Sequence, residues 1–364
     1  MRCPHCDTPV QDADRYCEAC GYDLVAGGEP VEAAPDERPG RWLSSARAAQ
    51  ACEGCGGTEF GEEGYCDGCG RRRPTGREHS ELDLEVIAAA SDIGHRHRHN
   101  EDAVGIGLLP GIAVGVVCDG VSSSDRPDTA SYAAVDAAVP ALLDALTDEP
   151  SDAQRALGLA AGAAQAAAAL AAGTAPGPNP PSSTFVAAVV TLDSVTVGWV
   201  GDSRAYWLPD PLPPDAPTAA ARKPGAGTGG TTGGRDIVGL APECLTTDDN
   251  VAGRLAAAAG TKATAEHPDG PSGALVRWLG ADAGDTAPHL LTVRPTGPGR
   301  VLVCSDGLFR YRPDPADLAA ATPAGTPLEV ARALVELALA AGGEDNISVA
   351  VLPFPCPDLR SPQS

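Results

Sequence analysis

Two uninterrupted apolar runs in this sequence each lead into an aspartate. Residues 111–118 read Gly-Ile-Ala-Val-Gly-Val-Val-Cys and precede Asp119, and residues 301–304 read Val-Leu-Val-Cys and precede Ser305 and Asp306. A run without polar residues at alternate positions predicts a strand that is buried on both faces. A carboxylate at the end of a buried strand is costly unless it is paired, hydrogen-bonded or bound to a cation. The chain must therefore form a sheet that brings such carboxylates to a place where their charge is compensated.

Three further short motifs place acidic residues beside predicted strands. They span residues 100–102 (Asn-Glu-Asp), 201–204 (Gly-Asp-Ser-Arg) and 344–346 (Glu-Asp-Asn). Each motif alone is weak evidence, because Asp beside Gly or Asn most often forms an ordinary turn. If the strand ends gather at one edge, however, their carboxylates form a site of oxygen ligands, which suits Mg²⁺ or Mn²⁺ better than Zn²⁺.

Strand and helix patterns alternate over residues 82–354, which we predict to be one α+β domain. The predicted strands cover residues 86–90, 112–118, 185–192, 195–200, 204–208, 290–293, 301–305 and 347–352. The predicted helices cover residues 129–146, 153–172 and 327–340. Long helices between strands, followed by a strand-rich middle, favour sheets covered by helices. Residues 209–235, mainly Pro, Gly, Ala and Thr, predict a disordered surface insertion.

Eight of the 12 cysteines form four Cys-x-x-Cys pairs near the start of the chain. The pairs are Cys3 with Cys6, Cys17 with Cys20, Cys52 with Cys55, and Cys66 with Cys69. Four thiolates can close a tetrahedron around one Zn²⁺, so the spacing predicts two structural zinc ions. The first pair of knuckles resembles the zinc-ribbon family, and the second pair matches it in spacing. A redox dithiol is the alternative, but it does not require two matched pairs in tandem.

The charge of the chain argues against a nucleic-acid partner. The chain carries 26 basic and 49 acidic residues, a net charge of −23. Residues 1–80 hold 9 basic and 15 acidic residues, so the predicted zinc ribbons also lack a cationic surface for phosphates. We therefore expect the ribbons to contact a protein or to serve structure alone, and the acidity to favour solubility.

The remaining segments are predicted to separate these units. We predict zinc ribbons at residues 1–25 and 52–73, a flexible linker at 26–51, a second linker at 74–81 and a tail at 355–364. Met1 and Arg2 lead into Cys3 without a signal peptide's apolar stretch. The most apolar tract, residues 157–172, is mainly alanine, and it is too short and weakly hydrophobic to span a bilayer. We therefore expect a soluble, cytoplasmic protein without membrane contact.

In wording and order, six segments resemble the PPM (type 2C) family of metal-dependent protein serine/threonine phosphatases. They are Asn-Glu-Asp (100–102), Asp-Gly (119–120), Ser-Thr-Phe (183–185), Gly-Asp-Ser-Arg (201–204), Ser-Asp-Gly (305–307) and Glu-Asp-Asn (344–346). Residues 245–248 and 277–280 also look like family segments. The resemblance covers residues 84–352 and implies a four-layer αββα sandwich. Two antiparallel sheets would be flanked by helices, with the metal ions at one end between the sheets.

The resemblance implies a role for each matched residue. Asp119 looks like the carboxylate that bridges two ions, and Gly120 offers its backbone carbonyl. Asp306 and Asp345 look like ligands of one ion. The chemistry implied is attack on phosphorus by a metal-activated water, so no side chain serves as a covalent nucleophile.

Four more positions are carried over by the same motifs. Glu101 and Asp102 look like ligands of the other Mn²⁺ or Mg²⁺ ion, or of its waters. Asp202 would help Asp306 to hold a third ion, whose presence the sequence leaves open. Asn346 would support the site without binding an ion.

Two positions depart from the family pattern. His97 stands where the family usually has an arginine that grips the substrate phosphate, and Arg96 and Arg98 flank it. We expect phosphate contact from these three residues, weaker than that of a guanidinium fork if His97 alone provides it. Arg310 stands four residues after Asp306, where many members have a further aspartate. A cation there opposes binding of a third ion.

The resemblance therefore implies hydrolysis of phosphoserine and phosphothreonine in proteins. A phosphoprotein, such as a Ser/Thr kinase or a kinase target, would be the substrate. The alternative is a catalytically weak phosphatase-like domain that acts as a regulatory or binding scaffold, with the zinc ribbons mediating protein contacts. The presence of all the core carboxylates favours the enzyme.

Overall fold

The computed structural model describes residues 40–47, 77–174, 177–210, 235–237, 241–259 and 271–357. Both predicted zinc ribbons, with all eight of their cysteines, lie outside these residues. Also outside them are residues 26–39 and 48–51 of the first predicted linker, residues 74–76 of the second, residues 211–234 of the predicted insertion and residues 358–364 of the predicted tail.

Two antiparallel sheets form the centre of the described part. The seven-stranded sheet has the order β1 (Arg41–Ser44), β4 (Ala103–Leu109), β5 (Ile112–Cys118), β7 (Phe185–Val190), β8 (Val195–Val200), β13 (His289–Pro295) and β10 (Arg235–Ile237). The six-stranded sheet has the order β11 (Glu243–Cys244), β9 (Arg204–Pro209), β14 (Gly299–Cys304), β15 (Ile347–Phe354), β3 (Ala88–Asp92) and β2 (His79–Asp83). Only the β10–β13 pair among these described strands is parallel. A short ladder joins β6 (Ser182–Ser183) to β12 (Leu279–Gly280).

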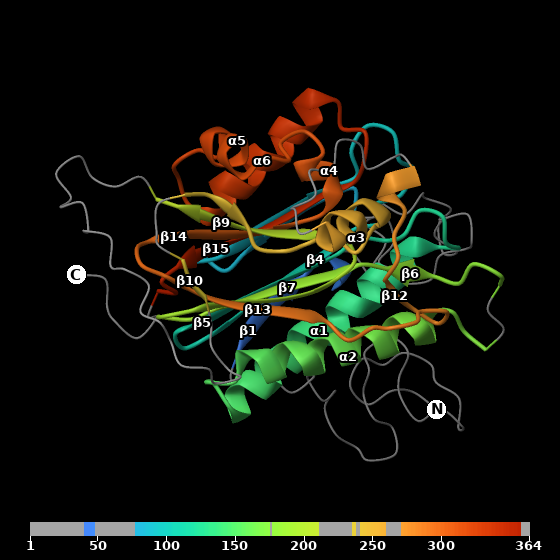
Figure 1. Cartoon of the computed structure of the whole chain (residues 1–364), viewed down its shortest axis with the longest axis horizontal. Helices are drawn as coiled ribbons and strands as arrows, with labels where there is room; N and C mark the ends of the chain where they lie inside the picture. Colours follow the sequence, from blue (N-terminus) through green and yellow to red (C-terminus); the bar gives the residue numbers. More distant parts are fainter. Residues whose placement is uncertain are drawn as a thin grey trace, which may run out of the picture. The chain divides into compact units, whose positions relative to one another are not determined.

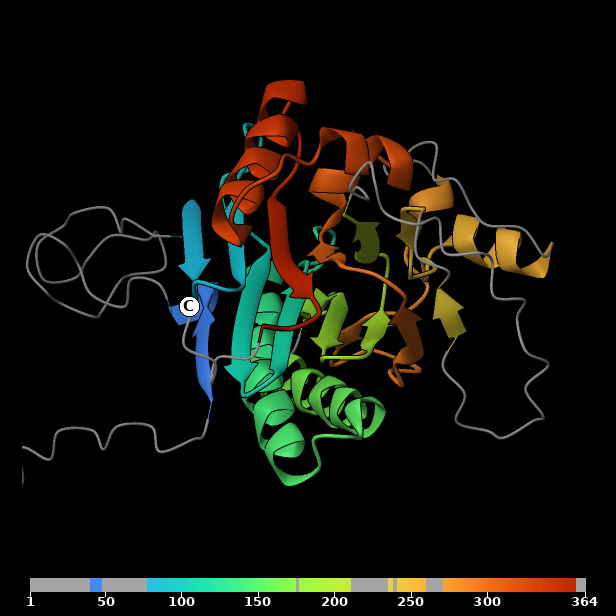
Figure 2. The ribbon, with the colours of Figure 1, turned by 90° about the vertical axis from the view of Figure 1, so that its left-hand side faces the viewer.

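Helices cover the outer face of each sheet. Helices α1 (Pro127–Asp148) and α2 (Ala153–Ala171) pack on the seven-stranded sheet, and α6 (Pro327–Ala341) packs on the six-stranded sheet. Figures 1 and 2 show α1 and α2 on one side of the two sheets, with α6, α5 (Pro315–Ala321) and α4 (Asp306–Phe309) on the other. The prediction of an α+β fold with two antiparallel sheets flanked by helices is confirmed. The smaller helices are α3 (Val251–Ala258), η1 (Ser45–Arg47) and η2 (Pro271–Gly273).

The apolar run of β5 is explained by burial on both of its faces. Val114 and Val116 pack in the cluster that includes α1, whereas Ala113 and Val117 pack between the two sheets. Between them, Gly115 allows a close approach of the sheets, because a Cβ there would lie 2.8 Å from Leu352 Cδ1. All seven residues of β5 are buried, so the prediction of a doubly buried strand is confirmed.

The predicted linkers extend too far into the fold. Residues 41–44 fall in the predicted linker 26–51 but form β1, which pairs with β4. Ser45 Oγ then accepts a hydrogen bond from the backbone N–H of Val104 at 2.9 Å. Likewise, β2 begins at His79, inside the predicted linker 74–81. β1 is short and pairs with β4 far along the chain. β2 pairs with the next strand, β3, but Leu82 is its one apolar residue, so it shows no apolar periodicity.

The C-terminal boundary and the alanine-rich tract also have clear structural explanations. Cys356 belongs to the predicted tail, yet it is buried, and its backbone N–H donates to Thr191 O at 3.1 Å. The alanine-rich tract forms most of α2, whose small side chains pack closely against α1. Within the described ranges, no helix combines the length and the apolar character needed to cross a membrane.

Candidate metal centre

Five aspartates predicted from strand ends lie at one end of the two sheets. Asp102 precedes β4 and Asp119 follows β5, and the pairing of Ala103 with Cys118 makes them neighbours. In the other sheet, Asp306 follows β14 and Asp345 precedes β15, while Asp202 precedes β9. Asp119, Asp202, Asp306 and Asp345 line a cavity of about 740 Å³. The predicted convergence of strand-end carboxylates therefore occurs in the structure.

Asp102 is the most deeply buried of these carboxylates. Its exposed fraction is 1%, and Ser305 Oγ donates to its Oδ2 at 2.6 Å. Its Oδ1 has no hydrogen-bond partner among the described residues. Burial, followed by the charges of Asp345 and Asp306, raises the pKa of Asp102 to about 7. A carboxylate in this position lacks a compensating positive charge.

A chain of hydroxyl groups behind Asp102 holds Ser305 in place. Ser305 Oγ accepts from the backbone N–H of Ser348 at 3.0 Å. Ser348 Oγ lies 2.7 Å from Ser91 Oγ, which accepts from Asn100 Nδ2 at 2.8 Å. This buried network joins β3, β15 and the segment before β4, so it fixes the direction of the Asp102 carboxylate.

The pKa values of Asp119 and Asp202 are raised for the same reasons as the pKa of Asp102. Burial raises the pKa of Asp119 well above its usual range, and the neighbouring charges of Asp102 and Asp306 add to this effect. Burial and the charge of Asp306 raise the pKa of Asp202 to about 8. A divalent cation would relieve this repulsion, because it stabilises the ionised carboxylates.

Sequence reasoning did not anticipate how Thr184 anchors Asp119. The backbone N–H of Asp119 donates to Thr184 Oγ1 at 3.0 Å, and the N–H of Thr184 donates to Asp119 O at 2.7 Å. Thr184 Oγ1 also lies 2.7 Å from Ser203 Oγ, beside Asp202. Thr184 belongs to the Ser-Thr-Phe segment, which gave a family signal but no role for its hydroxyl.

Glu101, Gly120 and Asn346 lie next to each other beside the aspartates. Glu101 O accepts from the N–H of Gly120 at 3.1 Å, and Glu101 N–H donates to Asn346 Oδ1 at 2.7 Å. A Cβ at Gly120 would lie 2.8 Å from Glu101 O, so the close approach requires glycine. Ser122 Oγ donates to Glu101 Oε2 at 2.8 Å, and burial raises the pKa of Glu101. Asn346 thus contacts the backbone of Glu101, and its supporting role at a metal site stays a prediction.

The donor set fits a hard divalent cation, although the side chains are not gathered around one point. Every candidate ligand is an oxygen atom, the preference of Mg²⁺ and Mn²⁺. The unpartnered Oδ1 of Asp102 and the raised pKa values show where positive charge is lacking. Nevertheless, no group of three His, Cys, Asp or Glu residues in the described ranges has the arrangement of an assembled metal site.

Arg310 lies among the carboxylates. Its Nη2 is 2.9 Å from Asp345 Oδ2 and 3.5 Å from Asp306 Oδ2, and its Nη1 is 4.0 Å from Glu344 Oε2. Asp306 and Asp345 are the two residues predicted to bind the same ion. The guanidinium thus supplies positive charge between them, close to the place where the sequence pattern predicted a conflict with a third ion.

Two of the three residues predicted to bind phosphate contact carboxylates, and the third is exposed. His97 Nε2 lies 3.1 Å from Asp345 Oδ1, and Arg96 Nη2 lies 2.5 Å from Glu344 Oε1. Arg98 is exposed. The described residues that line the cavity include Arg310 but none of these three.

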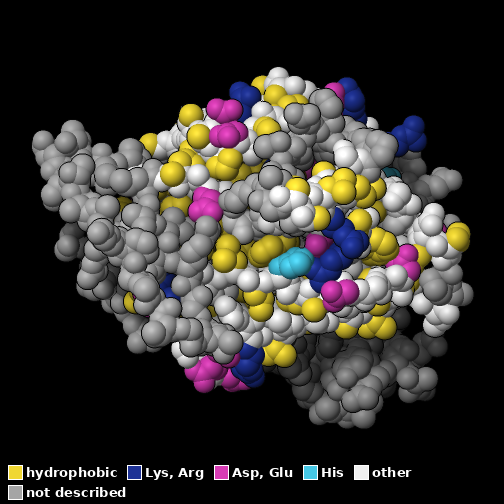
Figure 3. Space-filling view, in the orientation of Figure 1, with side chains coloured by type: hydrophobic (Ala, Val, Ile, Leu, Met, Phe, Trp, Pro, Cys, Tyr) yellow, Lys and Arg dark blue, Asp and Glu magenta, His cyan; other side chains and the backbone are white. Residues whose placement is uncertain are grey.

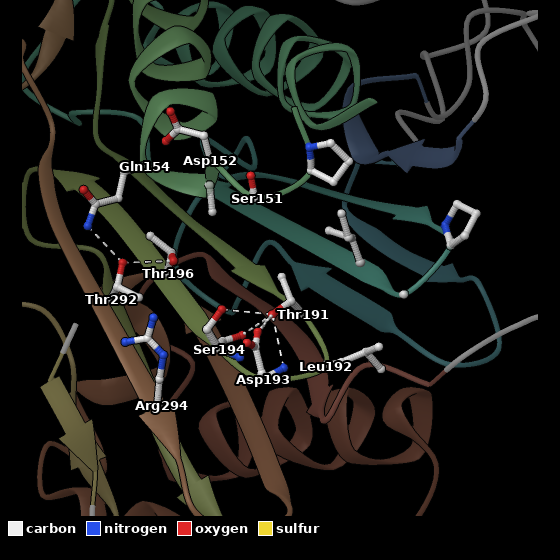
Figure 4. Close-up of a pocket in the computed structure, with 15 residues that line it drawn as sticks. Ser151, Asp152, Gln154, Thr191, Leu192, Asp193, Ser194, Thr196, Thr292 and Arg294 are labelled. Atoms are coloured by element: carbon white, nitrogen blue, oxygen red, sulfur yellow. Dashed lines mark hydrogen bonds between the residues drawn. The ribbon is translucent and has the colours of Figure 1, made fainter. Parts of the chain in front are cut away.

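A second cavity, of about 750 Å³, lies at the opposite end of the seven-stranded sheet (Figure 4). Ile112, at the start of β5, lines it, whereas Asp119 follows the end of the same strand. Several polar side chains in it bond one another: Gln154 Nε2 donates to Thr292 Oγ1 at 3.0 Å, and Thr292 Oγ1 lies 3.1 Å from Thr196 Oγ1. This cavity lacks the convergent carboxylates of the first.

On the face shown in Figure 3, the described charged side chains form small groups of mixed sign between hydrophobic ones. One mixed group defined by its contacts contains Asp249, Arg277 and His289. Asp249 Oδ2 lies 3.2 Å from Arg277 Nη1, and Asp249 Oδ1 lies 2.9 Å from His289 Nε2. Asp249 also accepts from the N–H of Gly201 at 3.2 Å, so this group is tied to the Asp202 loop.

Comparisons with known proteins give one family match and several solved structures of similar fold. The sequence model of the family described as "Protein phosphatase 2C" matches residues 93–211. The catalytic domain of the serine threonine protein phosphatase PstP, in complex with two manganese ions, is 25% identical. That match covers 73% of this chain and 96% of the PstP chain, with a TM-score of 0.52. No curated protein sequence gives a significant match.

Two further solved structures share the fold. The serine/threonine phosphatase PstP/Ppp of Mycobacterium tuberculosis is 24% identical over 73% of this chain and 96% of that chain, with a TM-score of 0.53. Stp1 from Staphylococcus aureus is 22% identical over 75% of this chain and 96% of that chain, with a TM-score of 0.56. The family model thus matches residues 93–211, and the chain shares its fold with solved structures of serine/threonine phosphatases over most of their length.

Proposed function

We propose that this chain hydrolyses phosphoserine and phosphothreonine in proteins with the help of two divalent cations, Mn²⁺ or Mg²⁺. The observation that carries this proposal is the convergence of aspartates from the ends of both sheets on one cavity. The manganese-containing PstP structure adds support, because its fold is similar over most of its length. A phosphoprotein is the substrate class that fits, and kinases or their targets are candidate members.

Asp119, Asp306 and Asp345 would hold the ions together with the Gly120 carbonyl. The flanking positions are Glu101, Asp102 and Asp202. Bound cations supply an activated water and offset the negative charge of the phosphoryl group. The assignment of each residue to an ion follows from the family resemblance and is part of the proposal.

The protein's own contribution is to hold these carboxylates before substrate arrives. The Ser305 hydroxyl orients Asp102, and Thr184 fixes the backbone of Asp119. Ser122, Ser123 and Ser124 line the same cavity, and the Ser122 hydroxyl holds the Glu101 carboxylate by donating to its Oε2. Such pre-organisation lowers the reorganisation needed during phosphoryl transfer.

The test is hydrolysis of a phosphothreonine peptide with and without Mn²⁺. Asp119→Ala and Asp306→Ala should each lower kcat/KM by about 100-fold or more, because loss of a ligand removes several kcal/mol of charge stabilisation. Asp144→Ala is the matched control, since Asp144 is exposed on α1, away from the cavity. Turnover without Mn²⁺, or equal turnover in all variants, would refute the proposal.

A regulatory or binding scaffold is the second candidate function. Arg310 favours it, because its guanidinium lies between two predicted ligands of one ion. A scaffold should bind Mn²⁺ weakly and turn over the peptide at the background rate. The same assay therefore separates the two functions.

A further inference from the structure

The residues expected to bind the substrate phosphate leave that role unfilled in the structure. His97 lies against Asp345 and Arg96 against Glu344, and neither side chain is among the described residues that line the cavity. Arg96 is also 66% exposed, and water and salt weaken the attraction between an exposed cation and an anion. A phosphate entering the cavity needs another cationic group near the carboxylates.

We propose that Arg310 binds the substrate phosphate in this cavity. This inference deepens the proposed phosphatase function and rests on it. Among the described residues that line the cavity, Arg310 is the one basic side chain, and it stands with five aspartates: Asp119, Asp202, Asp282, Asp306 and Asp345.

The charge balance of the cavity is the first argument. A phosphate monoester dianion is repelled by these carboxylates wherever cations do not neutralise them. Arg310 places a permanent positive charge 2.9 Å from Asp345 and 3.5 Å from Asp306. This charge stays in place at every pH of interest, because an arginine side chain does not lose its proton.

The burial and position of Arg310 are the second argument. Its side chain is 11% exposed, so its interaction with an anion is screened less than that of Arg96. Arg310 directly follows Phe309 at the end of α4, and the Phe309 ring packs 3.9 Å beneath the guanidinium of Arg204. The Arg310 guanidinium therefore extends from α4, a helix that this contact packs against the fold. Its planar set of N–H donors matches phosphate oxygens.

A competing role for Arg310 is that of a tethered cation that displaces an ion from Asp306 and Asp345. The two roles differ in what removal of the guanidinium does to phosphate binding. A phosphate-binding arginine is needed for phosphate affinity at full Mn²⁺ occupancy. A displacing arginine lowers Mn²⁺ affinity and leaves phosphate affinity unaffected once the ions are bound.

The experiment compares the full-length wild type with Arg310→Ala, Arg310→Lys and the control Arg312→Ala. Arg312 is exposed two residues further on, where its Nη1 donates to the carbonyl of Tyr311. Calorimetric titration with Mn²⁺ first establishes the concentration that saturates each variant. Titration of the saturated proteins with inorganic phosphate then gives the phosphate Kd. Kinetics with a phosphothreonine peptide give KM and kcat.

We expect Arg310→Ala to raise the phosphate Kd and the peptide KM by about 10-fold or more, the effect of one charge-assisted hydrogen bond. Arg310→Lys should recover part of the loss, because it keeps the charge without the planar fork, and Arg312→Ala should match the wild type. An unchanged phosphate Kd in Arg310→Ala overturns the inference, and tighter Mn²⁺ binding alongside it assigns the displacing role. The phosphate titration needs no turnover, so it decides the role of Arg310 even if the phosphatase function fails.

Discussion

The hydroxyl groups of Thr184 and Ser203 lie 2.7 Å apart and connect the two loops that carry Asp119 and Asp202. The Thr184 hydroxyl also accepts from the backbone N–H of Asp119, and the N–H of Thr184 donates to Asp119 O. One side chain therefore sets the position of one candidate ligand and its spacing to another. Thr184 is thus a positioning residue of the candidate centre.

Replacing Thr184 with valine should weaken metal binding while the fold persists. Loss of a supporting hydrogen bond behind a ligand typically costs about 10- to 100-fold in metal affinity. Thr196→Val is the matched control, because Thr196 is equally buried at 2% and its hydroxyl bonds Thr292 away from the carboxylates. Both variants should lose stability by about 1 kcal/mol, but calorimetry should detect weaker Mn²⁺ binding in Thr184→Val alone. Equal Mn²⁺ affinity in the two variants would contradict this assignment.

The sequence indicates the strands that converge but not the contacts behind them. The run before Asp119 reveals β5, because its residues pack alternately on α1 and on the other sheet. The direction of the Thr184 hydroxyl depends on a turn between distant strands, and no local pattern reports it. β1 shows the same limit, since residues 41–44 become a strand only through pairing with β4. Pairing between distant strands therefore determines features of the structure that local sequence periodicity does not predict.

Arg310 illustrates a second limit on what can be predicted from the sequence. Its position four residues after Asp306 marks it in the sequence as a cation near the site. Its contacts with Asp345 and Glu344 depend on how α4 meets the segment before β15. The sequence alone gave it a role against a third ion, whereas the cavity lining suggests a role toward substrate.

The buried ion pair of Arg204 and Asp248 should be a main support of this region. Arg204 Nε and Nη2 lie 2.9 and 2.7 Å from the two Asp248 oxygens, and both side chains are 6% exposed. Asp248→Ala leaves a buried guanidinium unpaired and should lower the free energy of unfolding by about 3–5 kcal/mol.

The control for this prediction is the exposed pair of Glu81 and Arg332, whose Oε2 and Nη2 atoms lie 2.6 Å apart. Glu81→Ala should cost less than about 1 kcal/mol, because solvent screens the pair. Urea unfolding of both variants provides the measurement. Similar losses of unfolding free energy in the two variants would show that burial does not determine how much the Arg204–Asp248 pair stabilises the fold.

Replacing a glycine with alanine should have opposite effects on stability at two positions. At Gly115, an added Cβ would lie 2.8 Å from Leu352 Cδ1 and 3.3 Å from Ala350 Cβ, so Gly115→Ala should destabilise by about 1–3 kcal/mol through overpacking between the sheets. At Gly158, inside α2, a Cβ would meet no atom within 4 Å. Gly158→Ala should therefore stabilise by about 0.5–1 kcal/mol. Thermal unfolding of the two variants tests the sheet spacing directly, and a neutral Gly115→Ala would refute it.

The eight N-terminal cysteines predict zinc that can be measured independently of the phosphatase domain. Elemental analysis of the purified chain should find about two Zn²⁺ per molecule, one for each set of four thiolates. Cys52→Ser should reduce this to about one. Cys244→Ser is the control, because Cys244 lies in β11 and its thiol contacts the carbonyl of Thr246. A zinc-free wild type would refute both ribbons.

The pH dependence of the metal-free protein should reveal the crowded carboxylates. The pKa values of Asp102 and Asp202 are raised to about 7 and about 8, chiefly by burial, whereas an unfolded chain has ordinary aspartate values near ~4. Between roughly pH 4 and 8, the folded protein therefore binds protons that the unfolded chain has released, and these groups lower stability as pH rises.

The variant Asp102→Asn isolates this contribution, because it removes one titrating group and keeps an oxygen to accept from Ser305. In the presence of a chelator, the fall in Tm between pH 5 and pH 8 should be smaller in Asp102→Asn than in the wild type. A difference of roughly 2–4 °C is expected for each kcal/mol removed. Asp144→Asn, on the exposed face of α1, should follow the wild type. Identical pH slopes in all three proteins would show that Asp102 is ionised at neutral pH without a metal ion, and the electrostatic argument for a cation at this site would then lose its basis.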